Sequence, residues 1–209
     1  MKKMKLNATL TLSVLIPCII PFNLVAATLI HAGKVIDSTS DKVMSQATVV
    51  VTDNKITAIN KGFTQAGADD TVIDLADYTL MPGFMDMHTH ITSQNSGLAG
   101  YMERYTLNEA DYALKGVGYA EKTLMAGFTT IRNLGDGYNE TVALRNAINK
   151  GELPGPRYLA NGPEIATLGG LGDTSPPHLM IPEMNFGCVV SGPEEMRAAV
   201  RRFIKFGVD

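Results

Sequence analysis

The residues of this chain best placed to do chemistry are two histidines one residue apart, His88 and His90, in the stretch LMPGFMDMHTHI. Residues i and i+2 of a β-strand point to the same side, so both imidazoles would project together from a strand. Neutral imidazoles are good ligands for Zn²⁺ and similar divalent metals. The pair therefore predicts half of a metal site, and the alternative is a strand end with two incidental histidines.

Asp86 lies two residues before His88 and would share its side of the strand. A carboxylate there could orient a metal ligand through a hydrogen bond, or it could simply bond to the local backbone. We expect one of these supporting roles for Asp86 rather than direct coordination of a metal.

The elements before the histidines predict a small, mostly antiparallel β unit over residues 28–80. Residues 47–60 alternate in polarity around Asp53 and Asn54, a pair that tolerates a tight hairpin turn. Residues 71–84 predict two more short strands, separated at Ala76-Asp77.

The pattern after Met81 is different, because short apolar strands alternate with segments of helical periodicity. A polar loop is expected over residues 92–100, and Asn108 and Gly127 are the expected cap and stop of the first helix. The predicted strands lie within residues 83–88, 128–134 and 156–166, and the predicted helices within 107–127, 139–151 and 192–207.

This alternation is typical of βαβ units with a parallel sheet, so the expected fold class is α/β. The prediction is the N-terminal part of a (β/α)8 TIM-type barrel, residues 81–209, with about three βα units, since a closed barrel needs about 250 residues. We expect the sequence to be an incomplete and inactive piece of a longer enzyme.

The first 27 residues have the pattern of a secretory signal peptide. Lys2, Lys3 and Lys5 precede a short apolar run, and small residues at Ala26 and Ala27 suit cleavage after Ala27. We therefore expect an exported protein, periplasmic or secreted, with no stable membrane span after cleavage. The net charge of −3 gives no electrostatic reason to expect a nucleic-acid partner.

The stretch LMPGFMDMHTHI resembles the first-strand signature of the amidohydrolase superfamily. The β-rich segment before it is similar to part of the small β-sandwich domain of those enzymes. TLMAGFTTIRNLGD and GELPGPRYLANGPEI resemble the branch with imidazolonepropionase-like and Xaa-Pro or Xaa-Arg dipeptidase-like members.

The resemblance implies a metal-dependent hydrolase that cleaves C–N bonds in amides, peptides or cyclic amides through a metal-bound hydroxide. His88 and His90 match two metal ligands, with one or two divalent ions, zinc by expectation, in the full protein. The implied partner is a small-molecule or dipeptide substrate. None of the family's other ligands, nor its catalytic acid, can be assigned to a residue of this chain.

Two positions depart from the family pattern. Leu171 stands where histidine is usual in a substrate loop, and Asn133 stands where aspartate is common. Asp173 and His178 are the candidate substrate-loop residues, with a solvated loop residue the favoured interpretation of His178. The Leu171 departure also leaves room for an exported non-enzymatic binding domain or a degenerate amidohydrolase-like protein.

Overall fold

The computed structural model describes residues 26–178 and 187–209. The chain divides into two compact units, the first ending at Met81 and the second beginning at Pro82. The predicted signal peptide, residues 1–27, lies almost entirely outside the described residues. Within the described ranges, no helix is both long enough and apolar enough to cross a lipid bilayer.

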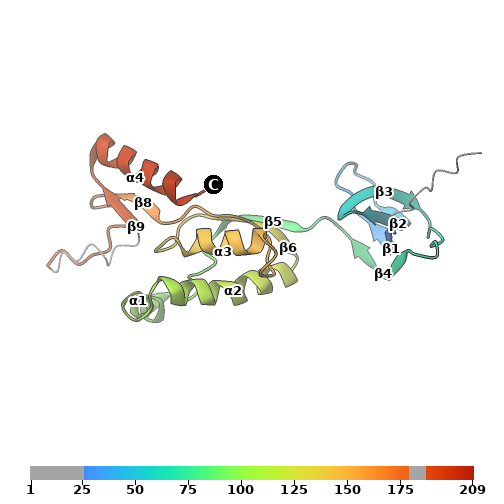
Figure 1. Cartoon of the computed structure of the whole chain (residues 1–209), viewed down its shortest axis with the longest axis horizontal. Helices are drawn as coiled ribbons and strands as arrows, with labels where there is room; N and C mark the ends of the chain where they lie inside the picture. Colours follow the sequence, from blue (N-terminus) through green and yellow to red (C-terminus); the bar gives the residue numbers. More distant parts are fainter. Residues whose placement is uncertain (1–25, 179–186) are drawn as a thin grey trace, which may run out of the picture. The chain divides into compact units, whose positions relative to one another are not determined.

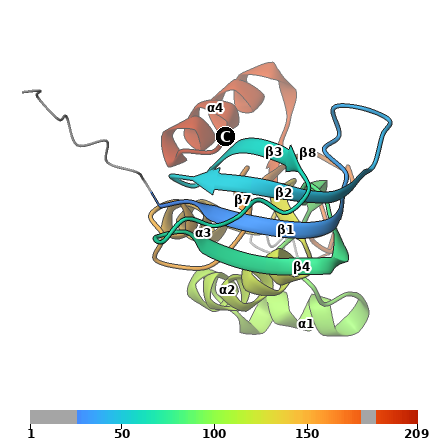
Figure 2. The same cartoon turned by 90° about the vertical axis from the view of Figure 1, so that its right-hand side faces the viewer.

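The first unit is a four-stranded sheet with the strand order β3-β2-β1-β4 (Figure 2). Its strands are β1 (Thr28–Val35), β2 (Met44–Thr52), β3 (Lys55–Lys61) and β4 (Thr71–Leu80). The β1–β2 and β2–β3 pairs are antiparallel, whereas β1 and β4 are parallel. Small and β-branched side chains of β1 and β2 form its buried core, namely Ala32, Val35, Ala47 and Val49.

The predicted hairpin is confirmed, because β2 and β3 are joined by Asp53 and Asn54 with positive φ angles of 50° and 61°. The prediction of two short strands over residues 71–84 was wrong. β4 runs unbroken through Ala76-Asp77, and a register shift between Ala32 and Lys34 of β1 absorbs the irregularity. Ala76 and Asp77 mark a bulge within one strand rather than a turn between two strands.

The second unit begins with three parallel strands in the order β5-β6-β7 (Figure 1). The strands and their helices are β5 (Phe84–Thr89), α1 (Gly97–Thr106), α2 (Glu109–Met125), β6 (Phe128–Asn133), α3 (Glu140–Asn149) and β7 (Arg157–Leu159). A separate parallel pair follows with a last helix, comprising β8 (Glu164–Thr167), β9 (Gly187–Val190) and α4 (Gly192–Phe206).

The apolar faces of α2 and α3 pack with β6 and β7. Their buried core joins residues from all four elements and the residue after His90, namely Ile91, Ala120, Ile131, Leu144 and Tyr158. The ends of α2 are as predicted. The Asn108 side chain accepts from the Ala110 and Asp111 amides in a capping box, and Gly127 follows the helix with a φ of 95°.

Three elements differ from the sequence prediction. Helix α1 begins inside the expected polar loop; it buries no residue and has no side-chain cap at Ser96, so it lacks the usual helix signals. The expected third strand is divided into β7 and β8, which belong to different sheets. Strand β9 was not predicted, and at four residues it is too short for a clear alternating pattern.

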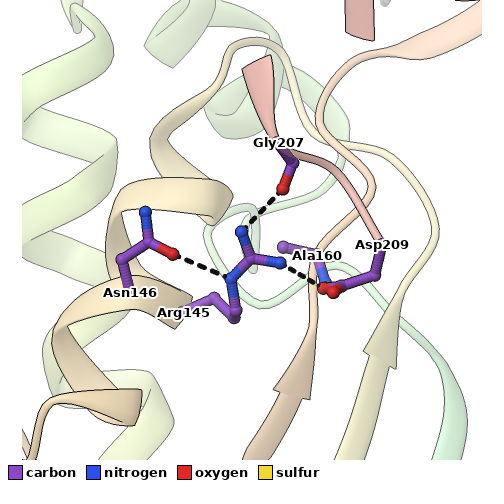
Figure 3. Close-up of polar contacts among 5 residues, drawn as sticks. All are labelled: Arg145, Asn146, Ala160, Gly207 and Asp209. Carbon is purple, nitrogen blue, oxygen red and sulfur yellow. Dashed lines mark hydrogen bonds and ion pairs between the residues drawn. The ribbon is translucent and has the colours of Figure 1, made fainter. Parts of the chain in front are cut away.

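The chain after α4 returns to the edge of the three-stranded sheet beside β7 (Figure 3). The Asp209 amide donates to the Ala160 carbonyl over 2.8 Å, and the Ala160 amide donates to Asp209 Oδ2 over 2.8 Å. Arg145 of α3 donates to Asp209 Oδ2 over 2.5 Å and to the Gly207 carbonyl over 2.6 Å. This places residue 209 where the next parallel strand of a barrel would lie.

We predict that Arg145→Met destabilises the protein by about 1–3 kcal/mol, because one guanidinium joins α3 to the segment that follows α4 and its acceptors would lose a charged donor. The matched control is Arg197→Met, whose partner Glu194 is on the same helix and whose side chain is 58% exposed. Surface pairs of this kind contribute about 0–1 kcal/mol. Urea unfolding midpoints check the difference, and equal losses in the two variants would contradict it.

Candidate metal site

His88 and His90 lie together at the carboxyl end of β5. His88 is in the strand and exposed, and His90 is the half-buried residue directly after it. Their ring centroids are 5.4 Å apart, with the ring planes inclined at 62°. Ligand sites in barrels and open α/β sheets form at this end of parallel strands, so position and spacing agree.

The His90 ring is anchored by the backbone. Its Nδ1 lies 2.5 Å from the carbonyl oxygen of Gly135, in the loop after β6. A carbonyl oxygen only accepts hydrogen bonds, so Nδ1 must carry the hydrogen. When the ring is neutral, the lone pair that could bind a metal is then on Nε2. In metal-ligating histidines such a contact commonly sets the tautomer.

Asp86 is half-buried on β5, and its Oδ1 accepts a hydrogen bond from the backbone amide of His88 over 3.0 Å. The contact ties the carboxylate to the backbone of one predicted ligand. This hydrogen bond stabilises β5 locally.

A pocket of about 350 Å³ opens beside His90. Glu103 lines one wall. Its Oε1 lies 2.6 Å from Lys115 Nζ, and Asn95 donates to the same oxygen over 2.6 Å. The Lys115 ammonium lowers the pKa of the Glu103 carboxyl below its usual range. The lining of the pocket combines polar and aromatic side chains with small residues, namely His90, Ser93, Asn95, Ser96, Gly97, Gly100, Tyr101, Glu103, Arg104 and Tyr112.

The predicted substrate-loop residues are placed elsewhere. Asp173 Oδ2 accepts from the Gly169 amide over 2.8 Å and so stabilises its own loop. His178 is exposed, as is Leu171, at 94%. Among the described residues, those that line the pocket beside His90 include neither Asp173 nor His178.

A buried polar cluster beneath the histidines was not predicted as part of the site. It begins at the last residue of β6 and contains Asn133, Asp136 and Glu140, each at most 1% exposed. Asn133 donates to Asp136 Oδ2 over 2.8 Å, and Thr92 donates to Glu140 Oε1 over 2.9 Å. The available sequence signal was the set of polar residues Asn133, Asp136, Asn139 and Glu140 at and after the end of a predicted strand.

Burial governs the protonation of this cluster. Loss of hydration raises the pKa of Asp136 above its usual range, although the Asn133 amide opposes the shift. Loss of hydration also raises the pKa of Glu140 from 4.5 to about 7, and the nearby Asp136 adds to the increase. The core residue Tyr158 has a raised pKa for the same reason.

The raised pKa of Glu140 predicts a stability change with pH. Between about pH 4.5 and pH 7 the unfolded chain loses the Glu140 proton while the folded protein keeps it, so stability falls as pH rises through this window. Glu140→Gln should remove up to about 3 kcal/mol of that dependence. Urea midpoints between pH 4 and pH 8 measure it, with the exposed Glu121→Gln as the control that should retain the full slope.

The histidine pair fits part of a metal-binding site. Two neighbouring imidazoles, one with its tautomer set by a carbonyl, are suitable ligands for a divalent ion. Across the described ranges, no group of three or more His, Cys, Asp or Glu side chains is placed to hold an ion. Zinc sites use three or four protein ligands, so the described residues would supply two of them if His88 and His90 bind such an ion.

The chain resembles several solved hydrolase structures. A Xaa-Pro dipeptidase with methionine bound in its active site is 39% identical, with a TM-score of 0.77 over 88% of this chain and 46% of that one. A prolidase in complex with N-methylphosphonate-L-proline is 27% identical, with a TM-score of 0.75 over 88% and 45% of the two chains. A putative prolidase from Bifidobacterium longum is 28% identical, with a TM-score of 0.63 over 88% and 39%.

This chain therefore spans about half the length of the structures it matches. A comparison with curated proteins found no match. The likenesses confirm an α/β fold that covers part of a TIM-type barrel, and they confirm the predicted resemblance to the dipeptidase-like branch. Residues 79–208, more than half of the chain, match the amidohydrolase family model, so the chain belongs to the amidohydrolase family.

Proposed function

We propose that this chain is part of a metal-dependent hydrolase that cleaves C–N bonds of dipeptides or related small amides. The observation that carries the proposal is the pair His88 and His90 at the carboxyl end of β5, with the Nδ1 hydrogen of His90 held by Gly135. Family membership supports the reaction class, and the Xaa-Pro dipeptidase and prolidase likenesses favour a dipeptide substrate.

In this proposal His88 and His90 hold a divalent ion, zinc by preference, with one or two ions in the complete site. An ion held there would supply Lewis-acid chemistry, polarising a carbonyl and lowering the pKa of water. Asp86 holds the His88 backbone, and Gly135 orients the His90 ring. The adjoining pocket of about 350 Å³ is large enough for a small substrate.

The proposal predicts that His88→Ala and His90→Ala each lower the metal content and reduce dipeptide hydrolysis by more than about 100-fold, because each removes a ligand rather than a supporting contact. The assay uses the full protein that carries these residues, metal analysis by mass spectrometry and a panel of Xaa-Pro and other dipeptides.

His31→Ala is the matched control. His31 lies in β1, where it contacts the Thr64 carbonyl and stacks on Phe63, so its removal should leave the metal content unchanged. Unaltered metal content and turnover in both variants of the pair would refute the assignment of His88 and His90.

We also propose that the protein is exported after cleavage behind Ala27. The support is the sequence of the first 27 residues, and Thr28 is the first residue of β1. Cleavage there would leave the first strand at the new N-terminus. N-terminal sequencing of protein from a secreting host should read Thr28-Leu29-Ile30, whereas material retained in the cytoplasm with Met1 intact would argue against export.

A further inference from the structure

The His90 ring is held by a hydrogen bond to the backbone carbonyl of Gly135. The hydrogen bond between them determines which ring nitrogen carries the hydrogen and where the other nitrogen points. Any displacement of Gly135 relative to His90 would therefore move the coordinating lone pair. Other contacts must therefore fix the position of Gly135 relative to His90.

Gly135 lies in the loop after β6, and contacts with other segments fix the position of this loop. Its φ is 131°, in the region that favours glycine, and a Cβ atom there would lie 3.1 Å from the Glu164 side chain. One backbone contact ties the following residue to a neighbouring segment, through Asp136 and the Gly162 carbonyl, and at 3.4 Å it is long. A side chain adds a further constraint on this loop.

Asn133 provides that constraint from both directions. Its Oδ1 accepts from the amide of Ile91, the residue after His90, over 2.9 Å. Its Nδ2 donates to Oδ2 of Asp136, the residue after Gly135, over 2.8 Å. Asn133 is fully buried, so water does not compete for either bond.

We propose that Asn133 is a positioning residue that clamps the loop of His90 to the loop of Gly135 and so sets the direction of the metal-binding nitrogen of His90. A third hydrogen bond joins the ends of the same two strands, since the Leu134 amide donates to the Thr89 carbonyl over 3.0 Å. The inference rests on the proposed function only in taking His90 to be a metal ligand.

The chemistry of the clamp favours an amide. The position needs one acceptor toward a backbone N–H and one donor toward a carboxylate, which asparagine supplies from a single side chain. An aspartate at this position keeps the acceptor and loses the donor. It could bond to Asp136 only if one of the two carboxyls held a proton.

The test uses the full protein and compares Asn133→Asp with the exchanged pair, Asn133→Asp together with Asp136→Asn. In the exchanged pair the donor moves to position 136, and both clamp bonds can form again. The measurements are Zn²⁺ affinity by competition with a chromophoric chelator at pH 8, the visible absorption of the Co²⁺ form, and the unfolding midpoint of the metal-free protein. None of these requires turnover.

We expect Asn133→Asp to weaken Zn²⁺ binding by about 10- to 100-fold and to alter the Co²⁺ spectrum, as loss of an orienting partner does at other histidine sites. The exchanged pair should recover most of both. Ile131→Val is the control for stability alone, because Ile131 is fully buried on the same strand and makes none of the clamp's hydrogen bonds. It should lower the unfolding midpoint while leaving the Zn²⁺ affinity intact.

The outcomes separate this inference from the proposed function. If Zn²⁺ binding by the parent protein does not depend on His88 and His90, the proposed function fails. If that binding depends on them but Asn133→Asp binds as tightly as the parent, or loses affinity only in step with stability as Ile131→Val does, the clamp is refuted and the function stands. Should Asn133→Asp not fold, a folded exchanged pair decides, with parental affinity supporting the clamp and weakened affinity overturning it.

Discussion

The parallel pairing of β5 with β6 is the constraint on which the candidate site depends. Thr89 at the end of β5 is opposite Asn133 at the end of β6, so the two strands leave the sheet side by side. Parallel strands direct their carboxyl ends to one edge, and the loops that follow must meet there. His90 and Gly135 are neighbours for this reason, although neither belongs to a strand.

The region beneath that edge combines an apolar core with polar groups that are costly to bury. Ile131 and Tyr158 belong to the core of the second unit, whereas Asp136 and Glu140 lie close by with one carboxylate oxygen each lacking a hydrogen-bond partner among the described residues. Unpaired buried oxygens usually destabilise a fold. Buried ionisable groups with shifted pKa values are more common at functional sites than elsewhere in proteins, and here they lie at one end of the sheet.

Glu140 illustrates how two opposing effects are balanced. It is the first residue of α3, where the helix N-terminus favours a negative charge, and it also accepts a hydrogen bond from Thr92. Burial acts in the opposite direction and is the larger effect, since the net result is a raised pKa. The carboxyl is therefore close to half-protonated at neutral pH, and its charge can respond to neighbouring groups such as Asp136.

The sequence by itself determined the local features of this protein. Alternating polarity around Asp53-Asn54, the Asn108 cap with the Gly127 stop, and the two-residue spacing of His88 and His90 all depend on near neighbours, so they can be predicted from the pattern. Short or weakly patterned elements such as α1 and β9 could not, because few of their residues carry a signal.

Only the tertiary structure decided how the site is held together. The partners of His90, Ile91 and Thr92 are Gly135, Asn133 and Glu140, each more than forty residues away in the chain. No local propensity encodes such contacts, since they arise when parallel strands with an intervening helix bring distant loops to one edge. The sequence indicates which residues could bind a metal, and the pairing of β5 with β6 decides that Nδ1 of His90 meets the Gly135 carbonyl.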